Sequence, residues 1–355
     1  MDVITILLLV AGLVILTFGA DFLVKGASSL AGSLGISPLV IGLTVVAFGT
    51  SAPEMSVSIS SALRGEADIA VGNVVGSNIF NVLFILGVSA IVASLMVQKQ
   101  LVRFDIPIMI YVSLIVLLMG IDGQISRFDG FLLFAGIIVY TLFLIKEARR
   151  EGVLVAEGSD DIEPPQPLWK NAILIIVGLA MLVLGSQWLV DGAVAIAKYF
   201  GLSELVIGLT IVAAGTSLPE LATSVMASIK GERDIAIGNI VGSNIFNICA
   251  VLGLSSLVSP EGLPVAQSSL LIDIPVMILV ALICLPVFLA NYTITRLDGM
   301  TFVVCYVAYV VYLVLAAQQS TWLVTVVPFL LAIVAVCLTW WMLEVVKYLR
   351  RQVSA

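Results

Sequence analysis

The sequence predicts an all-α polytopic membrane protein made of two inverted five-helix repeats and one extra C-terminal transmembrane helix. Three observations support this fold class: 61% of the 355 residues are hydrophobic and only 11% are charged, a 43-residue segment occurs twice, and each half has an odd number of apolar runs. Soluble domains are roughly 45–50% apolar and 25% charged. The composition therefore excludes a soluble enzyme, a disordered tail and a nucleic-acid-binding domain.

Charge-free runs give the expected spans of the first half. A transmembrane helix needs roughly 20 mostly apolar residues. Five runs meet this need approximately, at residues 3–20, 26–53, 69–98, 106–121 and 130–145. They define a first repeat over residues 1–146. An acidic stretch ending in Pro164 and Pro165 follows, and we interpret residues 147–168 as a solvated cytoplasmic linker.

The second half repeats this layout. Runs at 171–190, 205–219, 235–260 and 274–295 precede a 45-residue run at 299–343. At ~1.5 Å per residue that last run is about twice the thickness of a hydrocarbon core, so it must turn, most simply at 318–321. The second repeat is then 169–316, and residues 317–355 are an eleventh helix with a basic cytoplasmic tail. The four cysteines have no metal or disulfide spacing and are interpreted as packing residues.

Lysine and arginine placement predicts the orientation. With the N-terminus outside and eleven alternating helices, only Arg64, Arg127 and Lys198 among the 16 basic residues fall outside. Cytoplasmic loops carry an excess of basic residues. The N-terminus is therefore expected outside and the C-terminus in the cytoplasm.

The internal repeat is the most informative feature. Residues 39–81 and 205–247, at an offset of 166, are identical at 28 of 43 positions, and most matched residues are Gly, Ser, Thr, Asn, Pro or Glu. Because each half has five spans, the second enters the membrane from the opposite side. Inverted repeats typify secondary transporters, whose substrate site lies near the midplane between the repeats.

Each repeat carries a proline followed by an acid, Pro53-Glu54 and Pro219-Glu220. A charge at mid-membrane costs roughly 2.5–3.5 kcal/mol on insertion scales, so these acids should meet a cation or bind a proton. Proline removes a helical donor, and the turns at 47–50 and 213–216 are expected to open and free backbone oxygens. Ala47, Thr50, Ser51 and Glu54 share one helix face.

The next helix places Asn73, Ser77 and Asn81 on one face, matched by Asn239, Ser243 and Asn247. For Asn73 and Asn239 the alternative is bonding across helices alone, and Asn78 and Asn244, rotated off this face, are interpreted as scaffold. All available ligands are oxygens. Calcium takes six to eight oxygens, two carboxylates balance one Ca²⁺, and Na⁺ suits the carbonyl and hydroxyl groups.

These residues resemble the repeats of the calcium/cation antiporter superfamily, and the chain is most similar to its prokaryotic sodium/calcium exchanger (calcium/sodium antiporter) family. Both GTS-x-PE and GN-x-VGSNIFN stretches match, and the layout extends the resemblance to about residue 316. The resemblance implies a calcium site of Glu54, Glu220 and the Thr50 and Thr216 carbonyls. It implies sodium sites that use these four residues together with Ala47, Ser51, Ser77, Ala213, Ser217 and Ser243. Asn81 and Asn247 would line the centre.

By the same resemblance, the first helix of each half slides past the rest, and sodium entry drives calcium out with three Na⁺ for one Ca²⁺. Some relatives, including the potassium-dependent branch, have Asp at the position of Asn247. The Asn in this chain therefore weighs against potassium co-transport. No cofactor is expected beyond the transported Ca²⁺ and Na⁺, and no nucleic-acid partner. We expect an integral protein of a prokaryotic inner (plasma) membrane, of undetermined oligomeric state.

Alternatives remain open. The acids could carry H⁺ in an H⁺/Ca²⁺ exchanger, or the chain could be a cation channel; a hydrolase lacks a credible nucleophile and base. Asp105 and Asp273, each two residues before a proline, are interpreted as helix N-caps, as are Asp68 and Asp234 at the starts of their helices. Asp21, Lys25 and Asp191 are candidates for gating the sliding helices.

Overall fold

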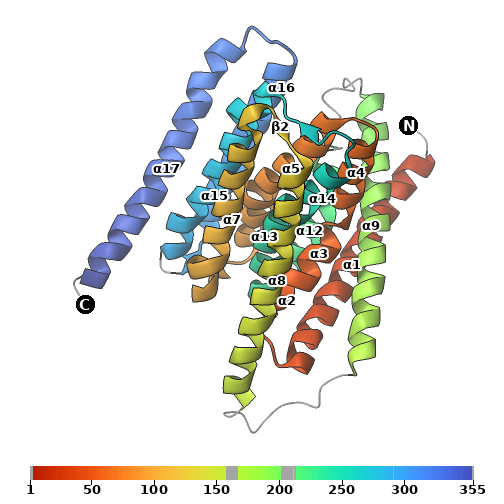
Figure 1. The fold of residues 1–355 in the computed structure, drawn as a ribbon, viewed down its shortest axis with the longest axis vertical. Coiled ribbons are helices and arrows are strands. Elements are labelled where there is room, and N and C mark those ends of the chain that lie inside the picture. The colour runs from red at the N-terminus through yellow and green to blue at the C-terminus, as the bar shows by residue number, and fades with distance from the viewer. Residues whose placement is uncertain (1–2, 157–166, 201–210, 212, 291, 354–355) are drawn as a thin grey trace.

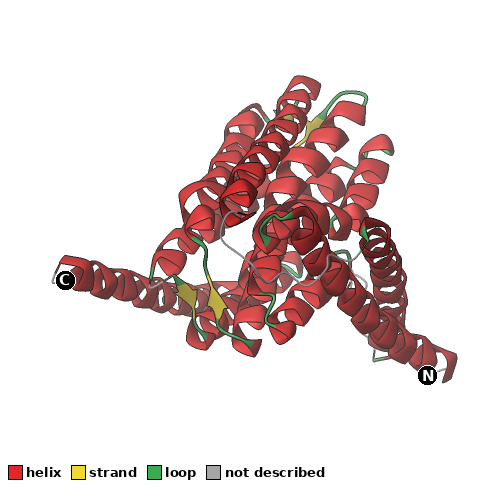
Figure 2. Ribbon diagram, turned by 90° about the horizontal axis from the view of Figure 1, so that it is seen from below, coloured by secondary structure: helices red, strands yellow, loops and turns green. Residues whose placement is uncertain are grey.

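The computed structural model describes residues 3–156, 167–200, 211, 213–290 and 292–353, and these are almost entirely helical (Figures 1 and 2). The first half contains, in order, α1 (Val3–Leu34), α2 (Pro38–Ile41), the π-helix η1 (Gly42–Val46), α3 (Ala47–Thr50), α4 (Ala52–Leu63), α5 (Ala67–Phe80), the π-helix η2 (Asn81–Leu86), α6 (Gly87–Val92), β1 (Leu95–Met96), the π-helix η3 (Leu101–Asp105), α7 (Ile106–Met119), the 3-10 helix η4 (Gly120–Asp122), β2 (Gln124–Ile125) and α8 (Arg127–Ala156).

The second half repeats this succession. It contains α9 (Leu168–Tyr199), α11 (Ala213–Gly215), α12 (Leu218–Lys230), α13 (Arg233–Phe246), the π-helix η6 (Asn247–Leu252), α14 (Gly253–Val258), β3 (Leu263–Pro264), the π-helix η7 (Ser269–Asp273), α15 (Ile274–Leu289), β4 (Thr293–Ile294), α16 (Arg296–Ala317) and α17 (Leu323–Val353).

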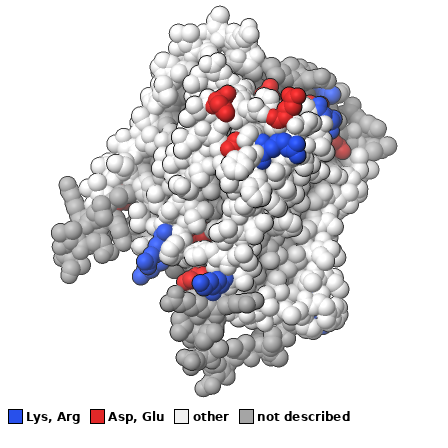
Figure 3. All heavy atoms as spheres, viewed as in Figure 1, with Lys and Arg blue, Asp and Glu red and all other residues white. Residues whose placement is uncertain are grey.

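Within the described residues, nine helices are long and apolar enough to cross a membrane. A tenth candidate is the pair Pro38–Thr50 and Ala52–Leu63, which is bent by 46°. Of the predicted span 205–219, residues 205–210 and 212 lie outside the described residues. The polytopic, all-helical fold class is confirmed. Charged side chains on the face in Figure 3 gather in two groups toward its two ends.

Several helices run through charges at which the sequence predicts an end. α1 continues past residue 20 to Leu34, because Lys25 and Asp21 form an i,i+4 ion pair of 2.7 Å within the helix. The second span therefore begins at Pro38 and not at residue 26. α8 likewise continues to Ala156, ten residues into the predicted linker, through Glu, Ala and Arg residues that favour helix.

The strand pairings show that the two repeats have opposite topology. β1 and β3 follow the third membrane segment of their respective repeats, and β2 and β4 follow the next one. β1 pairs with β4 and β2 pairs with β3, both antiparallel. Because one membrane segment separates β1 from β2, equivalent strands lie at opposite ends of the bundle. We call the β1–β4 end, from which α8 leads into the connection to α9, the linker end (Figure 1).

α1 and α9, the first helices of the two halves, pack side by side (Figure 1). Glycines at equivalent positions meet there: a Cβ on Gly185 would lie 2.6 Å from the Leu16 nitrogen, and one on Gly19 would lie 2.9 Å from the Gly178 oxygen. The close backbone approach is that of small-residue packing between membrane helices. The two helices therefore form one closely packed pair at the side of the bundle.

The extra helix α17 lies at the periphery, against α16 and α15 (Figure 1). Trp341 of α17 and Phe302 of α16 have ring centroids 4.8 Å apart. All four cysteines are buried and unbridged, which agrees with a packing role. At the opposite extreme, every residue of α13 from 235 to 246 is buried, so α13 forms the centre of the molecule.

Candidate ion-binding site

The two proline-containing segments bend at one residue each. Ser51, between α3 and α4, has φ −81° and ψ 7°, and Ser217 has φ −89° and ψ 8°. The expected opening of the turn at 47–50 is wrong: Ala47–Thr50 is α-helical and the Ser51 N–H donates to the Ala47 oxygen at 3.1 Å. Pro53 sits in the first turn of α4, where a missing N–H is tolerated, so the distortion stays at Ser51. The Ala213–Gly215 part of the other turn is helical too.

Both acids are fully buried, and each is held by a serine of the other repeat. Ser217 Oγ donates to Glu54 Oε1 at 2.7 Å, and Ser51 Oγ donates to Glu220 Oε1 at 3.0 Å. Since one acid comes from α4 and the other from α12, the repeats meet at this point. The structure thus brings the two predicted acids and their serines into one cluster.

The threonines also reach across the repeat boundary. Thr50 Oγ1 donates to Asn239 Oδ1 at 3.0 Å, and Thr216 Oγ1 donates to Asn73 Oδ1 at 3.3 Å. Asn73 Nδ2 donates to Ser58 Oγ at 2.9 Å, with the equivalent bond from Asn239 to Ser224 at 3.0 Å. Asn73 and Asn239 therefore bond across helices.

Ser58 and Ser224 are polar contacts that the sequence analysis passed over. Both lie one helical turn after the acids, and they are identical between the aligned repeats. That identity is the signal that could have revealed them. The amide nitrogens that they contact also donate to the backbone oxygens of Glu54 at 3.2 Å and Glu220 at 3.4 Å. These carbonyls fix the amide orientation of Asn73 and Asn239 because they can only accept.

The remaining predicted site residues fall in two groups. Ser77 Oγ lies 3.1 Å from Ser217 Oγ; since the Ser217 proton goes to Glu54, Ser77 is the donor, and this bond joins it to the Glu54 cluster. Asn81 and Asn247 are buried and begin the π-helices η2 and η6. Such irregular turns are frequent at functional sites. Ala47 is buried and packs against Gly242, and the side chain of Ala213 lies outside the described residues.

Five buried oxygen atoms of this region have no hydrogen-bond partner within the described part of the chain. They are Glu54 Oε2, Glu220 Oε2, Asn81 Oδ1, Asn247 Oδ1 and Ser243 Oγ. A buried unpartnered polar group costs about 1–3 kcal/mol. All five are oxygens, which are the ligands that hard cations such as Ca²⁺ and Na⁺ take.

A cavity leads to this region from one side. It has a volume of about 360 Å³ and is lined by residues of α4, α9 and the segment before α12, among them Pro53, Ser186, Gln187, Asp191 and Thr216. Thr216 is partly exposed, whereas its counterpart Thr50 is fully buried. The two equivalent halves of the site therefore differ in their access to the surroundings.

Contacts at the linker end join α1 to α12. Lys230, the last residue of α12, forms an ion pair with Asp21 of α1, and Ser28 of α1 donates to Glu232 at 2.6 Å. Of the three gating candidates, Asp21 thus contacts α12, Lys25 pairs with Asp21 within α1, and Asp191 lines the cavity beside Thr216. The Asp21–Lys230 and Ser28–Glu232 bonds join the two halves of the chain at the linker end.

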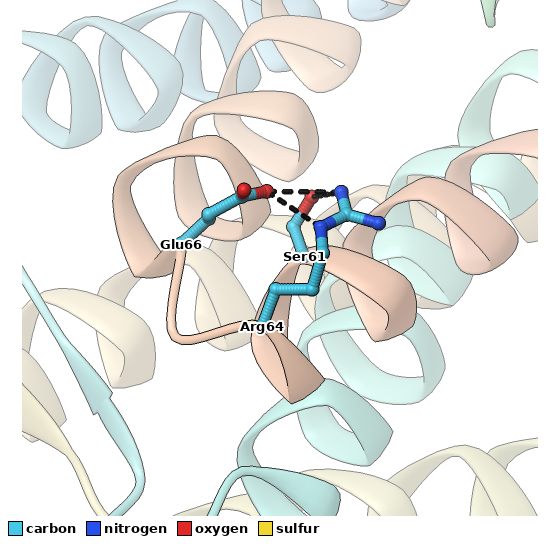
Figure 4. A network of polar contacts seen from close by, with 3 residues as sticks. All are labelled: Ser61, Arg64 and Glu66. Carbon is cyan, nitrogen blue, oxygen red and sulfur yellow. Dashed lines mark hydrogen bonds and ion pairs between the residues drawn. The ribbon is translucent and has the colours of Figure 1, made fainter.

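The equivalent loop at the other end makes no such bridge among the residues described. Arg64, the counterpart of Lys230, bonds to Glu66 at 2.9 Å and to Ser61 at 3.4 Å, all within its own hairpin (Figure 4). The Glu66 carboxylate raises the pKa of the Arg64 guanidinium. Among the described residues, this loop position therefore contacts the first helix of the other half at the linker end and not at the opposite end.

The expectation that Asp105 and Asp273 are N-caps is wrong. Both have helical backbone and no capping bond, because π-helices η3 and η7 run directly into α7 and α15. Their carboxylates instead accept bonds from Tyr140 (2.9 Å) and Tyr309 (3.0 Å). Asp68 and Asp234 lie within the first turns of α5 and α13 and do not cap them. Asp234 accepts a bond from Gln98 at 2.7 Å.

Acids, amides and hydroxyls that converge inside a bundle of membrane-length helices, with a cavity from one side, define an integral membrane transporter and not an enzyme. Residues 4–146 and 170–315 match the family model described as sodium/calcium exchanger protein. The chain belongs to this family. The sequence-based recognition is confirmed.

Individual relatives agree. The putative antiporter CaxA of Alkalimonas amylolytica is 46% identical over 263 residues, which cover 73% of this chain and 82% of CaxA. The sodium/calcium exchanger MaX1 of Methanosarcina acetivorans is 34% identical, over 88% of this chain and 99% of MaX1. A structure of the sodium-calcium exchanger NCX_Mj soaked with Na⁺ and Sr²⁺ matches with a TM-score of 0.74 at 32% identity, covering 86% of this chain and 97% of NCX_Mj.

Proposed function

We propose that this chain is an antiporter that exchanges Na⁺ for Ca²⁺ across the membrane by alternating access. The observation that carries the proposal is the cluster of buried, unpartnered oxygens around Glu54 and Glu220. Two carboxylates match the charge of one Ca²⁺, and neutral oxygens complete a flexible coordination shell. The choice of Na⁺ and Ca²⁺ is supported by the sodium/calcium exchanger family, to which the chain belongs, and by its similarity to the sodium/calcium exchanger MaX1.

In this proposal Glu54, Glu220 and the Thr50 and Thr216 carbonyls bind Ca²⁺. The same four residues, with Ala47, Ser51 and Ser77 in one half and Ala213, Ser217 and Ser243 in the other, bind Na⁺. Several Na⁺ and one Ca²⁺ then compete for the same carboxylates. This competition couples the two fluxes, because neither set of ions can bind while the other is present. With three Na⁺ for one Ca²⁺ the cycle is electrogenic.

Access from one side at a time follows from the asymmetry of the contacts. The cavity beside Thr216 would admit ions from the end away from the linker. The Lys230–Asp21 and Ser28–Glu232 contacts would keep the linker end closed. Sliding of the α1–α9 pair, which packs through glycine backbones, would break these contacts and open the other end.

The excess of basic residues on one side supports an orientation with the linker end in the cytoplasm and the N-terminus outside. The cavity then opens to the exterior, and the direction of transport is Ca²⁺ out of the cell across the inner membrane, driven by Na⁺ entry. The acidic connection between the halves is cytoplasmic in the same arrangement.

The test is ⁴⁵Ca²⁺ uptake into proteoliposomes loaded with Na⁺, K⁺ or choline, with and without a pH gradient. The proposal expects rapid uptake only with internal Na⁺. Because three Na⁺ leaving for one Ca²⁺ entering carries net positive charge out, an inside-positive potential should stimulate uptake and an inside-negative potential should slow it. Uptake driven by a pH gradient without Na⁺ would assign H⁺/Ca²⁺ exchange. Uptake that needs no counter-ion would assign a channel.

A further inference from the structure

Four asparagines form a closed network in the middle of the molecule, between α5 and α13. Asn78 Nδ2 donates to the backbone oxygen of Asn244 at 3.2 Å, and Asn244 Nδ2 donates to the backbone oxygen of Asn78 at 3.3 Å. Asn247 Nδ2 donates to Asn78 Oδ1 at 3.2 Å, and Asn81 Nδ2 donates to Asn244 Oδ1 at 3.0 Å. All four residues are buried.

The directions of these bonds are fixed by one fact: a backbone carbonyl can only accept. Asn78 must therefore turn its Nδ2 toward Asn244, where that nitrogen also lies 3.7 Å from the Met277 sulfur, a weak acceptor. The Oδ1 of Asn78 then faces Asn247. Since that oxygen can only accept, Asn247 must present its Nδ2 to it, and the Oδ1 of Asn247 is left pointing the other way.

The same sequence of constraints holds in the other repeat. Asn244 Nδ2 meets the Asn78 oxygen and lies 3.5 Å from the Met109 sulfur, so Asn244 Oδ1 faces Asn81. Asn81 Oδ1 and Asn247 Oδ1 are both among the buried atoms without a partner in the described residues. Asn78 and Asn244 thus determine that Asn247 and Asn81 turn their Oδ1 atoms away from them.

We infer that Asn78 and Asn244 are positioning residues that force Asn247 and Asn81 to present a carbonyl oxygen, and not an N–H group, to the bound cation. This inference rests on the proposed function. It assigns to Asn78 and Asn244 a role in ion affinity that goes beyond scaffold. An amide turned the other way would aim two N–H donors at the cation, which repels them.

Replacing Asn78 by the similarly sized leucine tests the inference. The Asn247 amide would then either turn its N–H group to the ion or leave that group buried without an acceptor, and both raise the energy of the Ca²⁺-bound state. We expect the KM for Ca²⁺ to rise about tenfold, with kcat within about twofold of the parent chain. Asn244→Leu, acting on Asn81, should have the same effect.

The decisive comparison places Asn78→Leu in an Asn247→Asp background. A carboxylate offers an oxygen to the ion in either orientation, so it needs no partner to orient it, and Asn78 Oδ1 facing it is unfavourable. Asn78→Leu should therefore leave the KM for Ca²⁺ unchanged or lower it in this background. Asn244→Leu in an Asn81→Asp background is the second arm.

A purely structural role would give a different pattern. It predicts the same fold-change in both backgrounds, or a loss of kcat and of the folded fraction in size-exclusion chromatography with no change in KM; either result overturns the inference. Failure of all the leucine variants to fold would also overturn it. If the parent chain exchanges Na⁺ for Ca²⁺ and only the KM effect is missing, the proposed function stands and this inference alone is rejected.

Discussion

Substitution of Glu54 by glutamine removes one of two buried negative charges while keeping the size of the side chain. Glu54 Oε1 accepts the Ser217 hydroxyl at 2.7 Å, and glutamine can keep this bond with its amide oxygen. The amide nitrogen then takes the place of Oε2, which is buried and without a partner in the described residues. A Ca²⁺ ion would lose a charged ligand and meet two N–H donors.

The size of the effect follows from the burial of the site. Removing one member of a buried charge pair costs about 3–5 kcal/mol. Every 1.4 kcal/mol is a factor of ten, so the affinity for Ca²⁺ should fall by roughly two to three and a half orders of magnitude. The Ser217 bond that glutamine retains should keep the fold intact.

The assay is initial-rate ⁴⁵Ca²⁺ uptake into Na⁺-loaded proteoliposomes over a wide range of Ca²⁺ concentration. The matched control is Glu66→Gln, which removes a carboxylate that bonds to the surface residue Arg64 at 2.9 Å. The control should change the KM by less than about twofold. A Glu54→Gln chain with a parental KM for Ca²⁺ would refute the assignment of this acid to the ion.

Three further predictions concern packing, gating and orientation. Gly185→Ala puts a Cβ 2.6 Å from the Leu16 nitrogen and should lower the free energy of unfolding by about 1–3 kcal/mol, seen as a lower Tm in detergent. The control Gly136→Ala, at a glycine with open space around it, should not lower the Tm. Equal Tm values for the two variants would contradict the packing of α1 on α9. Asp21→Asn weakens the contact with Lys230, an ion pair worth about 1 kcal/mol at a partly exposed position. In a Gly49→Cys background it should raise the rate of thiol labelling from the linker side roughly twofold to fivefold. An unchanged rate would show that the contact is not a gate. A cysteine introduced at Arg127 should react with an impermeant thiol reagent in intact cells. One introduced at Arg296 should react only after the cells are permeabilised. The reverse pattern would invert the predicted orientation.

The sequence predicted the repeat and most of the polar cluster because duplication marks them. Glu54, Ser51 and their counterparts recur at a fixed offset among apolar residues, and burial of such groups needs a chemical reason. The cross-repeat partners could not be predicted, since they depend on how α4 and α12 face one another. The Ser217 bond to Glu54 joins residues 163 positions apart.

Local rules failed where tertiary contacts supplied a competing partner. Asp105 stands before a proline, a position typical of an N-cap, but the buried Tyr140 hydroxyl donates to it across to α8. Helix ends were placed too early at Asp21 because an ion pair with Lys25 neutralises the charge within α1. The sequence-based prediction that the turn at Ala47–Thr50 opens failed because a single residue, Ser51, absorbs the effect of Pro53.

Equilibrium binding of ⁴⁵Ca²⁺ to the purified chain, measured at increasing Na⁺, examines the shared use of the two carboxylates without any dependence on transport. Competition by several Na⁺ for one site should shift the apparent Kd for Ca²⁺ upward with a slope above one in a logarithmic plot, at constant capacity. Calcium binding that ignores Na⁺ would mean that the two ions do not occupy the same acids.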